Sequence, residues 1–391
     1  MNLLAYARYE LQRRAALLPR EVGAWSDIAD TNENNFGIHK SQFQALKIMM
    51  TGLLERQEVL LDGFSEDLSP KQFAEQSLEF GDEVVGTHDL WKIFRQIMAQ
   101  RTDTALQRSV DAADLVAADC YLTCMAQARD WGAIEEQKFR EPPLTFFEAD
   151  SSPSTASRGF GIESLGFPIR RYRNMRLPIP IVVLPFDQAA SLWMFCNLHH
   201  EVGHNLDADL GLRDQFFNPL LNRMNADGIP ADRQKLWANK WSGEIVADVF
   251  GVMLGGAGFA QALGGWILTL TPAARFQELN SADVHPPFYI RVPLLVALLK
   301  NLEIAPLTET ARFLEDEWRR LPKPDWVDDF VSDCEIIADV FLNQKLNNLG
   351  NHSLREFNTE LANNMIQARQ VADCLPDNSC QNPDNIFFSH R

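Results

Sequence analysis

One long uncharged stretch limits the folds that this chain can adopt. Residues 249–274, VFGVMLGGAGFAQALGGWILTLTPAA, contain no charged side chain. A run of this length must be buried, either in the core of a folded protein or in a lipid bilayer. Glycine clusters at 255–258 and 264–265 interrupt the run, and such clusters are typical of breaks between helices. We therefore predict two packed core helices here, and a membrane span is the less favoured interpretation.

Length and composition are those of a globular protein with a large core. The chain has 391 residues, of which 46% are hydrophobic and 23% are charged, which favours one large or two medium domains. The formal net charge of -17 offers no counter-charge to phosphate backbones or to anionic lipid surfaces. The composition therefore argues against nucleic acid as a partner.

The N-terminus and the cysteines indicate a cytoplasmic protein. Residues 1–20 are charged from Arg8 onward and lack a continuous apolar segment followed by a cleavage site, so they are interpreted as an amphipathic helix and not as a secretion signal. The six cysteines form neither a disulfide framework nor a C-x-x-C pair, which favours reduced thiols. A bridge between Cys374 and Cys380 is the less favoured alternative.

The first part of the chain is predicted to be helical and without catalytic residues. Apolar side chains recur every three to four positions in residues 43–61, and a second long helical run covers 90–131. His39 and His88 stand alone in the sequence. We interpret residues 1–140 as a scaffold or a lid.

The composition changes after residue 140. Pro, Ser and Gly concentrate there and helical periodicity is lost, so residues 141–176 are predicted to be an irregular linker. The next segment, LPIPIVVLP at 177–185, is a β-branched run enclosed by prolines. Proline cannot donate to a β-ladder, so this segment is predicted to be an edge strand. An edge strand has free backbone groups that can pair with an extended peptide.

A metal-binding motif follows this strand. The segment NLHHEVGHNLD, residues 197–207, contains H-E-x-x-H with His200, Glu201 and His204. Residues four apart share one face of a helix, so the two imidazoles can bind one ion. Glu201, about 100° round the helix, can then reach a water molecule beside the ion. This arrangement is typical of a zinc hydrolase.

The helix that carries the motif is predicted to begin at an N-cap formed by Asp187 and to run to about Leu206. Aspartate favours this position because its side-chain oxygen accepts a hydrogen bond from the first turn. Asp207 and Asp209 follow the apolar part of the helix. We expect them to end the helix or to face solvent.

Catalytic zinc requires a third protein ligand and one open position. The metzincin spacing would need glycine at 207 and histidine at 210, but the sequence has Asp207 and Leu210, which excludes that class. We predict Glu244 as the third ligand, on a second helix that begins near Ala231. Asp248, one turn later, can accept a hydrogen bond from the free ring nitrogen of a ligand histidine and fix its tautomer.

Two alternatives to Glu244 and Asp248 stay open. In the first alternative, Glu244 and Asp248 are an ordinary i,i+4 acidic pair on a helix face, although an unpaired carboxylate inside an apolar run is costly to bury. A second copy of the string E-x-x-A-D-V-F also occurs, with Glu335 and Asp339. We favour Glu244 because it lies 44 residues after His200 (244 − 200 = 44), in a compact helix–loop–helix unit. We assign no role to the second copy.

A third motif lies in SADVHPPFYIRV, residues 281–292. His285 stands before two prolines that stiffen the chain, and Tyr289 and Arg291 follow. An imidazole, phenol or guanidinium held near a metal can donate to the oxyanion of a tetrahedral intermediate or contact the substrate. The alternative is a turn before a helix N-terminus.

In this order the three motifs resemble the gluzincin family that includes the CAAX prenyl proteases and the heat-shock-type membrane metalloproteases. The matching positions are His200, Glu201, His204, Glu244, Asp248, His285, Pro286, Pro287 and Arg291. The resemblance covers residues 177–300. It implies a zincin-like fold and a zinc-dependent peptidase with His200, His204 and Glu244 as ligands, Glu201 as the base and His285 as an oxyanion-stabilising residue. Proteins of that family are commonly embedded in membranes, and residues 1–140 have no counterpart there.

The sequence thus predicts a mainly α protein whose catalytic domain, residues 177–391, is zincin-like, with a small sheet, an edge strand, active-site helices and C-terminal helices. Its predicted function is that of a cytoplasmic zinc (Zn²⁺) metalloendopeptidase that acts on a peptide or protein substrate. One alternative is a non-catalytic helical interaction protein with a structural or absent metal, expected if His199 or Glu335 closes the fourth ligand position. Another is hydrolysis of a different amide.

Overall fold

The structure, a computed structural model, divides the chain into two compact units. It describes residues 3–31, 39–65, 67–103, 105–135, 140–149, 152–165, 171–172, 174–269, 279, 283–357, 361, 363–364 and 367. Unit 1 comprises residues 1–118 and 140–190, and unit 2 comprises 119–139 and 191–391. The division falls inside one helix, α6 (Gln107–Asp130). The prediction of a mainly helical protein with a small sheet is confirmed. Cys374 and Cys380 lie outside the described residues.

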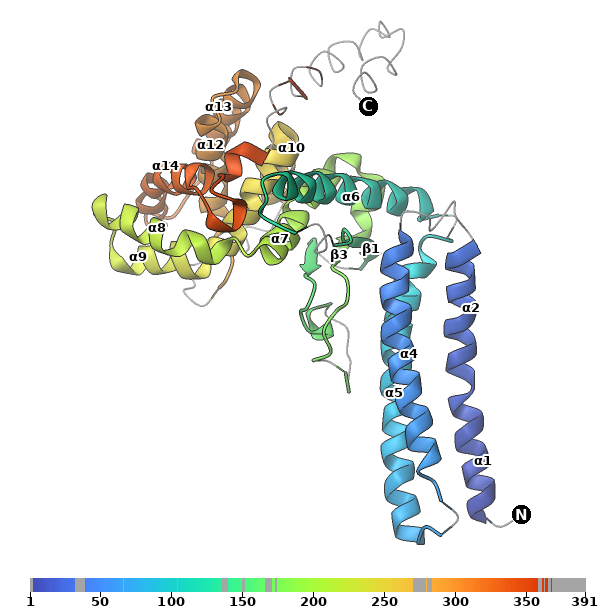
Figure 1. The fold of residues 1–391 in the computed structure, drawn as a ribbon. Coiled ribbons are helices and arrows are strands. Elements are labelled where there is room, and N and C mark those ends of the chain that lie inside the picture. Colours follow the sequence, from blue (N-terminus) through green and yellow to red (C-terminus); the bar gives the residue numbers. More distant parts are fainter. Residues whose placement is uncertain are drawn as a thin grey trace, which may run out of the picture. The chain divides into compact units, whose positions relative to one another are not determined.

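Unit 1 contains a helical bundle. Its helices are α1 (Leu3–Ala15), α2 (Leu17–Thr31), α4 (Lys40–Asp62), α5 (Pro70–Ala99) and the first part of α6. Helices α4 and α5 lie side by side (Figure 1) and bury residues such as Leu46, Met50 and Phe94. A capping box of Ser69 and Gln72 begins α5, because each side chain accepts from the other's backbone N–H.

A three-stranded sheet completes unit 1 and corrects two predictions. Its strands β1 (Leu144–Glu148), β3 (Ile181–Pro185) and β2 (Ser154–Ala156) lie in that order, with β3 parallel to β1 and antiparallel to β2. The segment predicted as an edge strand is therefore the central strand. Pro178 and Pro180 precede the strand and Pro185 ends it, so the residues between keep the N–H groups that pairing needs. Residues 141–176, predicted as an irregular linker, supply both outer strands.

Unit 2 is built around a long apolar helix. Helices α7 (Leu198–Leu210), α8 (Arg213–Ala226) and α9 (Ala231–Lys235) precede α10 (Ser242–Thr269), and α12 (Phe288–Asn301), α13 (Ala305–Arg319) and α14 (Val327–Asn343) follow it. Helix α10 contacts α7, α12 and α13. The core beside its N-terminal half includes Trp237, Trp241 and Phe250.

Helix α10 contains the described part of the uncharged run. The two helices predicted there are the halves of α10, which bends at Gly256, where φ is 55° and ψ is -135°. A positive φ favours glycine. The second predicted break, at 264–265, is absent because these residues continue the helix. By length and composition α10 is able to cross a membrane, but 78% of its most apolar 18-residue window is buried, which supports the core interpretation.

Candidate metal centre

The H-E-x-x-H motif lies on α7, which differs from the predicted helix at both ends. Two 3₁₀ turns, Phe186–Ala190 and Leu192–Asn197, come before it, so Asn197 is the N-cap and Asp187 is not. Asp207 and Asp209 lie inside α7, because each has a partner that holds it there. Asp207 is buried and accepts from the backbone N (2.8 Å) and Nε (2.6 Å) of Arg213. Asp209 accepts from the Tyr121 hydroxyl.

A glycine inside the motif lets α7 approach α10 closely. A Cβ atom at Gly203 would lie 2.9 Å from both the Cα of Ala247 and the Cβ of Phe250, closer than real Cβ contacts allow. Both helices therefore touch through backbone at this point. The motif's own spacing gives no sign of this contact, so our sequence reasoning missed the role of Gly203.

The close approach brings three potential ligands together. Nε2 of His200 lies 3.1 Å from Nε2 of His204 and 3.4 Å from Oε2 of Glu244, and Nε2 of His204 lies 3.2 Å from Oε1 of Glu244. Two atoms bound to one zinc ion at about 2.0–2.1 Å with tetrahedral angles lie about 3.3 Å apart. The three separations, two of which run to different oxygens of Glu244, are close to this spacing and place the side chains around one small cation. All three residues belong to the group of side chains able to hold a metal.

The helix that carries Glu244 starts later than predicted. The expected start near Ala231 belongs to the short α9, which is followed by a π-helical turn, Leu236–Lys240. Helix α10 then begins at Ser242. This places Glu244 in the first turn of α10, with its side chain almost fully buried.

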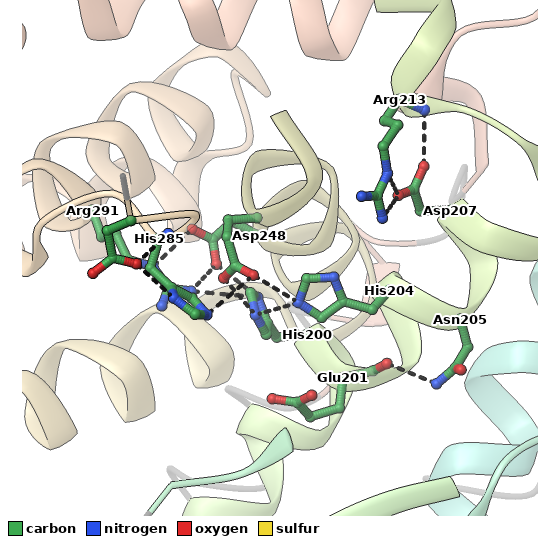
Figure 2. Close-up of polar contacts among 11 residues, drawn as sticks. His200, Glu201, His204, Asn205, Asp207, Arg213, Asp248, His285 and Arg291 are labelled. Atoms are coloured by element: carbon green, nitrogen blue, oxygen red, sulfur yellow. Dashed lines mark hydrogen bonds and ion pairs between the residues drawn. The ribbon is translucent and has the colours of Figure 1, made fainter. Parts of the chain in front are cut away.

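Asp248 and Arg291 form a second layer around His200. Oδ1 of Asp248 lies 2.8 Å from Nδ1 of His200, which is the predicted contact and leaves Nε2 for a metal. Arg291 donates to both oxygens of Asp248, at 3.1 Å from Nε and 2.5 Å from Nη2 (Figure 2). Arg291 was predicted to contact oxyanion or substrate. It is instead buried against Asp248, because a carboxylate inside the apolar α10 needs a cation.

The electrostatics of the group favour a bound cation. Burial alone would lower the pKa of His200, but hydrogen bonds with Asp248 and Glu244 raise it to about 10. Burial likewise opposes the charge of Glu244, yet the two imidazoles hold its pKa well below the usual value. Without metal, a proton on His200 therefore balances the carboxylates. A divalent cation can take the place of that proton.

Glu201 lies on the same helix but outside these ion pairs. Its side chain is buried, and burial raises the pKa of its carboxyl group. Figure 2 shows the Glu201 carboxyl group apart from Asp248 and Arg291. Within the described part of the chain the carboxyl group has no hydrogen bond or ion pair, while the backbone oxygen accepts from Asn205. The carboxyl group is thus available for proton transfer.

His285 lies beside the ligand group and is open to solvent. Its Nε2 is 3.6 Å from Oε1 of Glu244, and its side chain is 59% exposed. Oδ1 of Asp283 lies 3.0 Å from the backbone N of His285, which donates to it, and 3.1 Å from Nδ1 of the same residue. Our sequence reasoning missed Asp283, although its position two residues before His285 is typical of such a turn.

The hydroxyl of Tyr289 is hydrogen-bonded to a residue outside the metal group. Its hydroxyl donates to the carbonyl oxygen of Pro322 at 2.6 Å, and the side chain is buried. Tyr289 lies in the first turn of α12, whose N-cap is Pro287. The hydroxyl proton is therefore used in packing and is not directed to an oxyanion or a substrate in this structure.

The residues that would close a fourth ligand position lie elsewhere. Nδ1 of His199 donates to the carbonyl of Cys196 at 2.8 Å. Glu335 is exposed on α14 and accepts from Asn301, and Asp339 accepts from Asn343. Among the described residues the candidate group thus has three protein ligands.

Comparison with known proteins adds no relative. No family model, no curated protein and no solved structure matches this chain. The resemblance to gluzincins therefore rests on the motifs alone. The functional argument rests on the geometry of the side chains around His200.

Proposed function

We propose that this protein is a zinc-dependent metallopeptidase. The observation that carries the proposal is the set of separations of 3.1 to 3.4 Å among His200, His204 and Glu244, with Glu201 on the same helix as the two histidines. Three ligands drawn from two helices, with the fourth position left for water, are typical of catalytic zinc sites. A structural zinc site needs a fourth protein ligand, which is why we favour a hydrolase over a non-catalytic helical protein.

The chain's own residues divide the chemistry among them. Bound zinc would lower the pKa of water towards neutrality and polarise a carbonyl group. Glu201 would take the proton from the attacking water and pass it to the leaving amine nitrogen. Burial raises the pKa of its carboxyl group, which makes the carboxylate a stronger base for this exchange. Asp248 and Arg291 would keep the His200 ring fixed. His285, on the solvent side, would donate to the developing oxyanion.

The proposal includes a substrate class and a location. We propose a peptide or protein substrate in a cytoplasmic setting, with the zincin-like part of the fold in unit 2. Strand β3, which was predicted to be an edge strand that aligns the substrate, is the central strand of the unit 1 sheet. Its backbone groups are paired with β1 and β2, so β3 is not assigned to substrate binding. Another amide remains the second substrate class, because the same residues serve both reactions.

Metal analysis tests the ligand assignment. We expect about one zinc per chain in the wild type, loss of zinc in Glu244→Ala, and retention in Glu335→Ala. Glu335 is a matched control because it occupies the same place in the repeated E-x-x-A-D-V-F string but lies on the surface of α14. Elemental analysis after supplementation with zinc provides the measurement. A wild type that holds no zinc would contradict the proposal.

Glu201→Gln separates catalysis from metal binding. The amide keeps the size of the side chain but cannot accept the proton, so turnover of a peptide substrate library should fall about 10²- to 10⁴-fold. Zinc content should stay at the wild-type level. Turnover equal to that of the wild type would remove Glu201 from the role of base.

A further inference from the structure

Two adjoining cavities in unit 2 lie among α10, α12, α13 and α14. The apolar cavity has a volume of about 520 Å³ and is lined by residues of α10, α12 and α13 and by Leu321. The charged cavity has a volume of about 230 Å³ and is lined by residues of α12, α13 and α14 together with Lys323. Val292 and Trp318 belong to the walls of both. The two cavities therefore lie next to each other, and none of their lining residues belongs to the metal group.

The apolar cavity has the size and the walls of a site for a hydrophobic group. Pockets for small ligands usually measure about 300–1,000 Å³. The polar side chains in this wall are those of Gln261 and Glu317, and the others are apolar or glycine. Phe313, also in the wall, is 56% exposed. Its ring therefore adds apolar surface at the edge of this cavity.

The wall of the charged cavity carries three cationic side chains, Lys300, Arg319 and Lys323, and two carboxylates, Glu315 and Glu335, a formal balance of +1 (3 − 2 = 1). Nζ of Lys300 lies 2.8 Å from Oε2 of Glu315, and Nη2 of Arg319 lies 2.6 Å from Oε1 of the same residue. Two cations thus share one carboxylate. Glu335, the other carboxylate of the wall, accepts from Nδ2 of Asn301 at 3.0 Å. In a chain with a net charge of -17, a cavity wall with a small positive balance favours an anion.

A third cation stands where the two cavities meet. Nζ of Lys323 lies 4.6 Å from the centre of the Trp318 ring, which belongs to both walls. Its ion-pair partner, Asp328, is 66% exposed. Such a pair is weak because water screens it, so a ligand anion can compete for Lys323. The junction therefore joins an apolar space to an available ammonium group.

We propose that the two cavities together bind an anionic amphiphile with a single alkyl chain, a long-chain fatty carboxylate. The alkyl chain would occupy the apolar cavity, and the carboxylate would lie at Lys323 with Lys300 and Arg319 beyond it. Charge complementarity selects the anionic head group, and the volume and walls of the apolar cavity select the chain. The residues that line this site include none of the metal centre, and the proposal does not rest on the proposed peptidase activity.

The chain-binding part is tested with tetradecanoate and shorter fatty carboxylates below their micelle concentrations. Calorimetric titration of the full chain should show one site, with affinity rising about fourfold per added methylene, equivalent to ~0.8 kcal/mol. Gly265→Phe should weaken binding of tetradecanoate at least tenfold, since Gly265 lines the apolar cavity and a Cβ there meets no atom within 4 Å. Gly52→Phe on α4, where the space is equally open, should bind like the wild type.

The head-group part is tested by removing one charge. Lys323→Gln should weaken tetradecanoate about tenfold through loss of a charge-assisted bond, and should leave the weaker binding of tetradecanol unchanged. Lys71→Gln on α5, whose side chain is 87% exposed, is the control. The proposal is overturned if the wild type does not bind tetradecanoate, if Gly265→Phe binds it as well as Gly52→Phe, or if tetradecanol binds as tightly as the acid.

Discussion

The two units each contain a buried histidine, aspartate and arginine in contact, but the groups differ in what surrounds the aspartate. In unit 1, Asp114 contacts Nε2 of His39 at 2.9 Å and Nη2 of Arg101 at 2.7 Å. In unit 2, Asp248 contacts Nδ1 of His200 at 2.8 Å and Nη2 of Arg291 at 2.5 Å. All of these aspartate and arginine side chains are buried. The residue types alone therefore do not separate a structural group from a functional one.

The remaining contacts make the difference. In unit 1, Asp114 also accepts from the backbone N and the hydroxyl of Thr145, and Nδ1 of His39 pairs with Gln42. Both ring nitrogens of His39 are thus used inside unit 1, which ties α4, α6 and β1 together. In unit 2, Nε2 of His200 faces His204 and Glu244. A buried charged group becomes a candidate site when one of its ring nitrogens is directed at other ligand atoms.

Asp114→Ala should produce the largest effect in this comparison. It leaves the Arg101 guanidinium buried without its carboxylate, which costs about 3–5 kcal/mol. Urea unfolding gives the loss of stability, and chelator competition should give zinc affinity equal to that of the wild type in protein that remains folded. A clear fall in zinc affinity would show that the unit 1 group is not merely structural.

Asp248→Asn should act on the metal instead. The amide keeps the shape of the side chain but weakens its hold on His200, so zinc affinity should fall about 10- to 100-fold. Asp339→Asn is the control, because Asp339 has the same place in the repeated string and accepts from Asn343 outside the ligand group. Equal zinc affinities in the two variants would contradict the role of Asp248 in metal binding, and the His200 group would then not differ from the His39 group of unit 1.

The change in zinc affinity over one pH unit should be the smallest of these effects. Because the pKa of His200 is raised to about 10, the metal-free ring is protonated at neutral pH and must lose that proton when zinc binds. We expect the zinc dissociation constant to fall up to tenfold per unit between pH 6 and pH 8. Competition titrations at each pH provide the values, and a flat profile would contradict the assigned protonation state.

The same proton has an opposite effect on the metal-free protein. A histidine whose pKa is raised on folding stabilises the folded state fully below its unfolded pKa of about 6.5. This contribution decreases as the pH rises from about 6.5 to about 10. Zinc should therefore increase the stability of the chain more at pH 8 than at pH 6.

The parts of the site that local spacing determines could be predicted from the sequence. The four-residue spacing of His200 and His204 places both rings on one helix face, and the apolar surroundings of Asp248 pointed to a buried partner. These inferences need only helical periodicity and the cost of burying a charge. The partner of Asp248 was expected to be a ligand histidine, and His200 is in contact with Asp248. The additional partner, Arg291, was not predicted, because its position depends on how α12 packs against α10.

Features that depend on distant partners could not be predicted in this way. The prolines around residues 181–184 predicted an edge strand, yet both outer strands come from the segment predicted to be a linker. Aspartate is a residue type favoured at N-caps, so Asp187 was predicted to begin the helix, but two 3₁₀ turns lie between Asp187 and α7. Tyr289 faces Pro322 because α12 packs against the segment after α13. In each case tertiary packing decided between locally equivalent possibilities.

The two proposed ligand sites lie on opposite sides of the bend of α10 at Gly256, and this shared helix links their binding equilibria. Glu244 and Asp248 lie before the bend, and the lining residues Gly264 and Gly265 lie after it. Phe259, also after the bend, stacks on His200 with 6.2 Å between ring centres. If the proposed ligands bind at both ends, their equilibria share one helix and obey reciprocity: any factor by which a fatty carboxylate changes zinc affinity is the factor by which zinc changes affinity for the carboxylate.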